Sequence, residues 1–281
     1  MPIKGLTDKP KYLTTTSGKK FETYRFYLKS YCNYLQANYS NLPQFISYCL
    51  KHTSSIKPLG NIEIDEISRH LRIAWNTEYL LTIDYGLPEI TRINNQWTPI
   101  QAYYAVYSGL EALSYGINGT HTSSHIKALR KCSNFFINLG ISPWDLAFVG
   151  NRGKKKNSQE PKNFPEDISL PHNLQRHGIR PIDMIAKCLK VEHSHRVDDK
   201  WEGKSKSGYY KYQYDPRPTT LLHFLYRLRI KSNYQEVDTF VAEAPSEIIS
   251  EFAKSLQTIT SWTLSLIEII LIRRIGKEKV N

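Results

Sequence analysis

The fold is decided by a stretch near the middle of the chain, TPIQAYYAVYSGLEALSY at residues 98–115. Thr98 has the hydroxyl that an N-cap needs, Pro99 suits the first helical position, and Gly116 is placed to end the helix. The segment is apolar on most sides and carries small residues that permit close approach of a neighbouring helix: Ala102, Ala105, Gly109 and Ala112. We therefore predict a central, buried helix.

Helical spacing of apolar residues continues on both sides of this stretch. It predicts helices over residues 20–37, 42–52 and 64–85. After the central helix, Ser123 or Ser124 caps a helix that runs through Phe136 and stops at Gly140. The motif helix is predicted from Pro218 to about Lys231 and continues after a bend over residues 234–241. A last long helix begins at Pro245 and Ser246.

Residues 141–216 have a different composition and read as an irregular insertion. Within it the pattern predicts a short helix over residues 182–189 and a small β-hairpin over residues 207–215. The chain is thus predicted to be all-α, with an irregular insertion, a small hairpin and a long C-terminal helix. Three parts are expected: N-terminal helices over 1–60, a core over 62–241 and a C-terminal helix over 246–281.

The chain is basic and rich in tyrosine. Its 281 residues include 38 Lys and Arg against 26 Asp and Glu, which leaves a net charge of +12. Such a charge attracts polyanions, and the 19 tyrosines supply flat faces that stack on bases or fill a core. The simpler alternative is that the basic surface only aids solubility. No Gly-rich phosphate loop, GxSxG elbow or paired-carboxylate pattern is present, which disfavours nucleotide hydrolysis and esterase chemistry.

Cysteine, histidine and hydropathy patterns narrow the setting. The four cysteines are far apart without a CxxC pair, and no apolar leader follows Met1, so we expect a reduced cytoplasm. The most apolar run, residues 262–272, is shorter than the roughly 20 residues of a membrane span, which predicts a packed helix and no membrane. His121 with His125 and His193 with His195 lack convincing carboxylate partners, so we expect neither metal nor cofactor.

The stretch RIKSNY at residues 229–234 lies where one predicted helix meets the next. Taken with residues 103–116 and the helix start at residues 125–129, it resembles the HEPN superfamily of all-α, RNA-associated domains. The resemblance covers roughly residues 62–241 and its motifs are short. It implies a HEPN-like helical bundle that acts on RNA as a metal-independent endoribonuclease of the toxin or antiviral-defence kind, working as a homodimer or larger assembly.

In that superfamily, members that cleave RNA carry an Arg followed after four to six residues by a His. Arg229, Asn233 and Tyr234 match the spacing, but tyrosine replaces histidine. A histidine with a pKa near 6.5 can take a proton from a ribose hydroxyl at neutral pH, whereas a tyrosine near 10 is a poor base. The alternative is that Arg229 and Asn233 hold the helix end by hydrogen bonds while Tyr234 packs.

A second pair with permitted spacing is Arg217 and His223, which contains a true histidine. Pro218 places Arg217 just outside the helix, where a guanidinium can reach a phosphate. The alternative is that His223, between Leu222 and Phe224, is a packing residue.

Basic and aromatic residues alternate before the motif helix, the combination that binds flexible RNA. The predicted contacts are Lys204, Lys206, Tyr209, Tyr210, Lys211, Tyr212, Arg152, Lys154, Lys155 and Lys156. A solvated basic loop beside a tyrosine-rich hairpin is nearly as good an interpretation. Two further functions stay open: a non-catalytic module that binds nucleic acid or protein, and a structural partner subunit.

Overall fold

The computed structural model describes residues 11–60, 63–83, 88–122, 124–150, 159–172, 178–199, 217–241 and 244–276. Its elements are η1 (Lys11–Thr14), α1 (Thr16–Tyr39), α2 (Leu42–His52), α3 (Ile64–Thr82), α4 (Pro88–Asn94), α5 (Thr98–Asn118), α6 (His125–Leu139), β1 (Ala147–Gly150), β2 (Gln159–Lys162), α7 (Pro181–Asp199), α9 (Leu221–Ile230), η2 (Lys231–Gln235), α10 (Val237–Phe240) and α11 (Ser246–Ile275). The fold is all-α with a small hairpin and a long C-terminal helix, as predicted.

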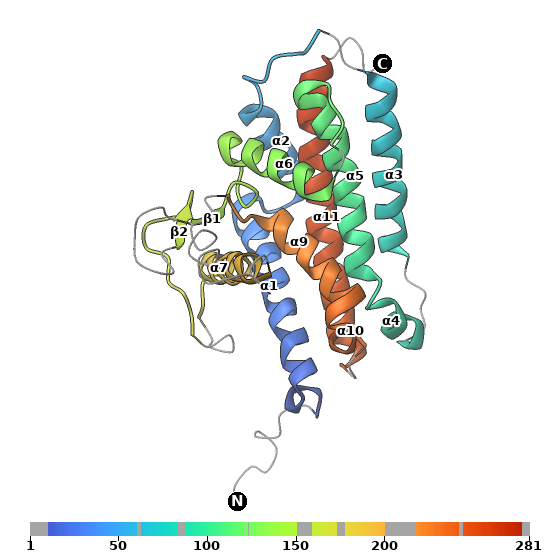
Figure 1. Cartoon of the computed structure of the whole chain (residues 1–281), viewed down its shortest axis with the longest axis vertical. Coiled ribbons are helices and arrows are strands. Elements are labelled where there is room, and N and C mark those ends of the chain that lie inside the picture. The colour runs from blue at the N-terminus through green and yellow to red at the C-terminus, as the bar shows by residue number, and fades with distance from the viewer. Residues whose placement is uncertain are drawn as a thin grey trace, which may run out of the picture.

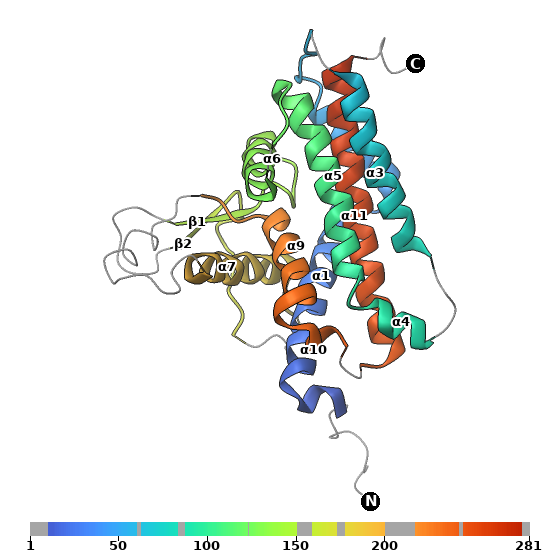
Figure 2. The ribbon, with the colours of Figure 1, turned by 45° about the vertical axis from the view of Figure 1, so that its right-hand side comes forward.

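Helix α5 lies at the centre of the bundle. Helices α3, α5 and α11 run side by side along the long axis, and α9 crosses beside α5 (Figures 1 and 2). A Cβ atom added at Gly109 would lie 2.7 Å from Leu264 Cδ2 and 3.1 Å from Ile267 Cδ1. One added at Gly116 would meet Leu271. The small residues of α5 therefore permit the close packing of α11, as the sequence predicts.

Replacing Gly109 with leucine is expected to destabilise the fold by about 1–3 kcal/mol, because the new side chain overpacks the α5–α11 contact. Chemical denaturation of the purified variant measures this change. Gly60→Leu is the matched control, because a Cβ at Gly60 meets nothing within 4 Å. Equal stabilities of the two variants would contradict the close packing.

The N-terminal helices share their core with the rest of the chain. The apolar face predicted for α1 is buried, from Phe21 through Leu35, and packs against α7 and α11. One cluster of buried side chains runs from Tyr12 to Leu271 and includes residues of α1, α5, α9 and α11. Aromatic contacts tie the segments together, including Phe21 with Phe252 at 4.9 Å between ring centroids.

Helix α11 is the longest helix among the described residues, with 30 residues. By length and composition it is apolar enough to cross a membrane. However, 67% of its most apolar window is buried inside the fold, against α1, α3 and α5. Its hydrophobicity is therefore accounted for by the core.

Both ends of α5 differ from the prediction. Trp97 occupies the N-cap position, and the hydroxyl of Thr98 donates to the carbonyl of Asn94 at 2.9 Å instead of capping the helix. Gly116 lies inside the helix against α11, and the left-handed residue that ends the helix is Gly119, with φ +68°. The Gly116 boundary was wrong because that glycine serves helix packing rather than a turn.

The predicted insertion contains more regular structure than its composition indicates. The short helix predicted over residues 182–189 is wrong in extent, because α7 runs from Pro181 to Asp199. Strands β1 and β2 pair antiparallel, with Ala147 opposite Lys162. The hairpin predicted over residues 207–215 lies outside the described residues.

The motif helix also begins and ends differently. Helix α9 begins at Leu221 rather than Pro218, with Thr220 as its N-cap, and it passes after Ile230 into the π-helical turn η2. The preceding residue Thr219 pairs with Phe148 of β1 through two backbone hydrogen bonds of 2.8 and 3.0 Å. The start of α9 is therefore fixed against the hairpin.

Candidate functional site

Arg229, near the end of α9, lies among tyrosines of the central helix. Its Nη2 donates to the hydroxyl of Tyr104 at 2.8 Å. Its Cζ lies 5.2 Å from the ring centroid of Tyr104, 5.8 Å from that of Tyr103 and 5.7 Å from that of Tyr234. Tyrosine faces attract a cation but do not neutralise it. The site therefore retains a positive charge.

The guanidinium of Arg229 also has hydrogen-bonding capacity to spare. Its Nε is buried and has no hydrogen-bond partner among the described residues. The side-chain partners that the described part of the chain gives this group are all tyrosines. Because a guanidinium binds phosphate through two parallel N–H groups, this arrangement suits an anionic ligand.

His125 lies in the same cluster, at the first position of α6. Its Nδ1 is 2.8 Å from the hydroxyl of Tyr103, and its ring centroid is 4.0 Å from that of Tyr107. The rings of Tyr104 and Tyr226 lie near it as well, with centroids at 6.0 and 6.2 Å. Ser124 caps α6 by accepting from the backbone N–H of Lys127, which fixes the helix start that carries His125.

Burial lowers the pKa of His125 below its ordinary value, and the charge of Arg229 lowers it further, while Glu111 raises it. The imidazole is therefore neutral at neutral pH. In the tautomer whose Nδ1–H donates to Tyr103, Nε2 carries the lone pair that a base needs. The chain thus places an imidazole beside Arg229, although it comes from another helix than the one that carries the RNA-cleavage motif.

The link between these two groups can be measured directly. Replacing Arg229 with glutamine removes one cause that lowers the pKa of His125, so that pKa is expected to rise. NMR titration of the histidine ring protons measures it, with His125→Gln to assign the signal. An unchanged His125 titration in the Arg229→Gln variant would contradict the cluster.

Asn233 and Tyr234 lie in the π-helical turn η2, a feature that is frequent at functional sites. The side chain of Tyr234 is 67% exposed, and its ring lies against Arg229. The end of α9 is held by other groups: the ammonium of Lys231 lies 2.7 Å from Glu236, which also accepts from Tyr24 at 2.9 Å. Tyr234 is thus placed to meet a ligand rather than to fill the core.

The second predicted pair, Arg217 and His223, lies along a cavity of about 240 Å³ between α6, α7 and α9. His223 is the third residue of α9 and belongs to its capping box, where its Nδ1 accepts from the backbone N–H of Thr220 at 3.3 Å. Burial and the charges of Arg196, His193 and Arg217 hold its pKa well below the ordinary value. His223 is therefore a weak base with a structural hydrogen bond.

The remaining histidines of the two pairs have separate partners. His121 Nδ1 lies 2.8 Å from the buried carboxylate of Glu111, and His193 Nδ1 lies 3.0 Å from the hydroxyl of Thr219. His195 Nδ1 is 3.9 Å from Glu192. Within the described ranges, no group of three or more His, Cys, Asp and Glu side chains is placed to hold a metal.

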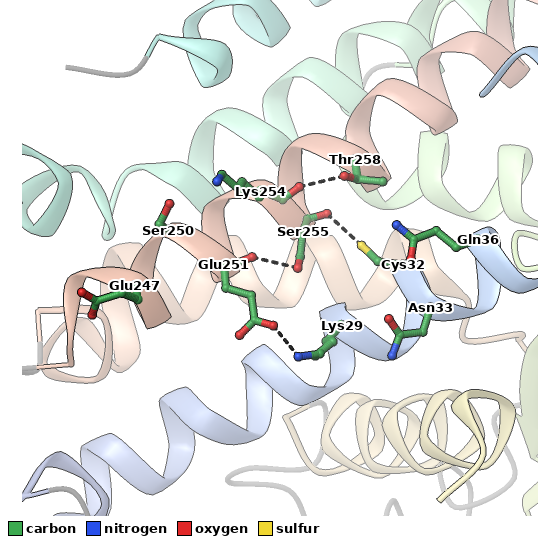
Figure 3. Close-up of a pocket in the computed structure, with 10 residues that line it drawn as sticks. All are labelled: Lys29, Cys32, Asn33, Gln36, Glu247, Ser250, Glu251, Lys254, Ser255 and Thr258. Atoms are coloured by element: carbon green, nitrogen blue, oxygen red, sulfur yellow. Dashed lines mark hydrogen bonds and ion pairs between the residues drawn. The ribbon is translucent and has the colours of Figure 1, made fainter. Parts of the chain in front are cut away.

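A larger groove, of about 510 Å³, runs between α1 and α11. Figure 3 shows its polar side chains, where Glu251 pairs with Lys29 and Cys32 approaches the backbone of Ser255. Burial raises the pKa of Cys32 to about 11, so its thiol is protonated and a weak nucleophile. The groove therefore lacks the unpaired charge and basic groups that the Arg229 cluster has.

The basic residues predicted to bind RNA, at 152–156 and 204–212, lie outside the described residues. Sequence reasoning named Arg229 but missed His125 as a site residue, treating it as part of a helix start. Its neighbours Tyr103 and Tyr104 at i and i+1, with Tyr107 one turn on, were a usable signal of an aromatic site on α5. Comparisons of the chain with family models, curated proteins and solved structures find no match.

Proposed function

We propose that this protein acts on RNA as a metal-independent endoribonuclease with a composite site made of Arg229 and His125. The observation that supports the proposal is the Arg229 cluster itself, in which a guanidinium surrounded by tyrosines lies beside a neutral imidazole. The HEPN resemblance of residues 229–234 and the net charge of +12 favour RNA as the substrate.

The chemistry assigns one step to each group. Nε2 of His125 takes the proton of a ribose 2′ hydroxyl, whose oxygen then attacks the adjacent phosphorus. Arg229 stabilises the negative charge that develops on the phosphate oxygens. The bond to the 5′ oxygen breaks, and that oxygen takes a proton from the hydroxyl of Tyr234, which recovers it from the imidazolium through water. The products are a 2′,3′-cyclic phosphate and a 5′ hydroxyl.

The test is to incubate purified protein with single-stranded RNA in excess EDTA. We expect cleavage that leaves cyclic phosphate ends, because no step of the proposal uses a metal ion. A set of oligonucleotides of different sequence and a folded RNA covers unknown specificity. Failure to cut any of them in the presence or absence of EDTA would contradict the nuclease proposal.

RNA binding is expected to depend strongly on salt. Replacing Lys204, Lys206 and Lys211 with alanine should reduce the slope of log affinity against log salt by about 2, at roughly 0.7 per phosphate contact on a single strand. Fluorescence anisotropy at several salt concentrations measures it. An unchanged slope would exclude these lysines from the binding surface.

A non-catalytic binding or assembly module is the second candidate, and one observation favours it. Tyr234 stands where the RNA-cleaving members of the HEPN superfamily have histidine, and it is exposed. Apolar side chains are also exposed on α3 and around α4, among them Ile73, Tyr79, Leu80, Ile93 and Trp97. Large exposed apolar surface is typical of protein interfaces, including those of homodimers. Salt-sensitive RNA binding without cleavage would favour this second function.

A further inference from the structure

We propose that the cavity between α6, α7 and α9 binds the phosphate of a mononucleotide. Four arginines line it: Arg130, Arg196, Arg217 and Arg227. Among the described lining residues there is one carboxylate, that of Glu192, which lies 3.4 Å from Nε of Arg227. Because His223 is neutral, the described lining carries an excess of positive charge. Such convergence of guanidinium groups is characteristic of phosphate recognition.

The fold brings these arginines together from four places. Arg130 comes from α6, Arg196 from α7, Arg227 from α9, and Arg217 from the segment that leads into α9. Arg196 donates to the backbone carbonyls of Pro218, at 3.0 Å, and of Arg217. These bonds fix one wall of the cavity and hold the backbone of Arg217 at its mouth. The positive charge is therefore built into the packing of α7 against α9.

The remaining lining is apolar and suits a sugar and a base. It is provided by Ile126, Leu129, Pro218, Tyr226 and Ile230. The volume of about 240 Å³ equals that of about eight water molecules at roughly 30 Å³ each, which exceeds the needs of a bare phosphate. The aromatic ring of Tyr226 offers a stacking face for a base. This combination favours a nucleotide over inorganic phosphate.

The cavity adjoins the Arg229 cluster but is separate from it. Tyr226 lines the cavity, and its ring centroid lies 5.4 Å from that of Tyr103 and 6.2 Å from that of His125. Ile126 and Ile230, also in the lining, are next in sequence to His125 and Arg229. A nucleotide in the cavity would therefore lie one side chain away from the proposed cleavage site, as a free molecule or as the phosphorylated end of an RNA strand.

The experiment is isothermal titration of the full chain with nucleoside 5′-monophosphates, the matching nucleosides and inorganic phosphate. We expect at least one monophosphate to bind at least about tenfold more tightly than its nucleoside and than inorganic phosphate. Binding of nucleoside and nucleotide with equal affinity, or no binding of any monophosphate at millimolar concentration, would overturn the proposal.

The double variant Arg130→Gln and Arg217→Gln tests the location. It leaves the bonds of the Arg196 side chain in place, and it should weaken nucleotide binding at least about tenfold. Lys19→Gln with Lys254→Gln removes the same charge from exposed positions outside the cavity and should leave the affinity unchanged. Equal losses in the two double variants would show that general charge, not the cavity, binds the nucleotide.

Two RNA arms separate the sources of the phosphate. If a short RNA with a 5′ phosphate displaces the mononucleotide better than the same RNA with a 5′ hydroxyl, the cavity binds an RNA end. If neither RNA displaces it, the ligand is a free nucleotide. Either result supports the phosphate site. Binding is measured without turnover, so absence of RNA cleavage leaves this test intact, and the reverse also holds.

Discussion

Replacing His125 with alanine is expected to lower the rate of RNA cleavage by about 10²–10⁴-fold, the contribution typical of a general base. The substitution removes the imidazole that lies 2.8 Å from the Tyr103 hydroxyl and beside the guanidinium of Arg229. His125 is partly exposed, so its loss leaves no large cavity in the core. Single-turnover cleavage of a labelled RNA measures the change without interference from product release.

Two histidine controls distinguish the proposed site from its alternatives. His52→Ala removes an exposed histidine of α2 and should leave the rate unchanged. His223→Ala removes a capping-box partner, so it should lower stability by about 1 kcal/mol and leave cleavage largely intact. A folded His125→Ala variant that cuts at the parental rate, with His223→Ala inactive, would assign the chemistry to the Arg217 and His223 pair.

Arg229→Lys supplies the complementary experiment. Lysine keeps the charge but loses the planar fork that binds two phosphate oxygens, so a large loss of rate is expected with little loss of stability. If Arg229 and His125 act as one unit, the double variant should be little slower than the slower single variant. Fully additive losses would indicate that the two groups act independently.

The pH dependence of cleavage carries the same information. A base must be unprotonated, and the pKa of His125 is lowered by burial and by Arg229. The rate is therefore expected to fall only below the ordinary histidine range, as acid protonates Nε2, and to be independent of this group at neutral pH. An acidic limb centred above pH 6.5, the ordinary histidine value, would contradict His125 as the base.

The helices were predictable because their signal is local. Helical spacing in residues 20–37, and the small residues at 102, 105, 109 and 112, identify buried faces without knowledge of the partner helix. The exact ends were less predictable. Gly116 and Gly119 are three residues apart and equally able to end a helix, and the choice depends on Leu271, which packs against the first.

Polar residues buried by tertiary contacts account for the underestimate of α7. His193 is fully buried and contacts Thr219, while Arg196 holds the backbone before α9. In sequence, the run around them has the polar composition of a loop. Their partners are more than twenty residues away, so local patterns carry no trace of these bonds.

The candidate site divides along the same line. Arg229 and Tyr234 form a local motif and were predicted from spacing, whereas His125 joins them through the packing of α6 and α9 against α5. The tyrosines of α5 connect the two, since Tyr103 contacts both His125 and Arg229. A composite site of this kind depends on tertiary structure, and sequence reveals its parts without their association.

Replacing Trp144 with alanine is expected to cost about 3–5 kcal/mol of the free energy of unfolding, the largest effect on stability that we predict. Trp144 is fully buried, its ring centroid lies 5.2 Å from that of Phe45, and its Nε1 donates to the hydroxyl of Thr263 at 2.9 Å. The side chain thus joins the loop after α6 to α2 and α11. Chemical denaturation measures the loss.

Two further variants separate the causes of that loss. Trp144→Phe keeps much of the volume but removes the N–H donor, so it should cost less than Trp144→Ala by the part that arises from the cavity. Trp97→Ala removes a tryptophan that is 50% exposed and should cost about 1 kcal/mol or less. Because Trp144 packs between α2 and α11 while the Arg229 cluster lies between α5, α6 and α9, Trp144→Ala should still cleave RNA where it remains folded. Loss of cleavage in the folded variant would show that the two regions are coupled.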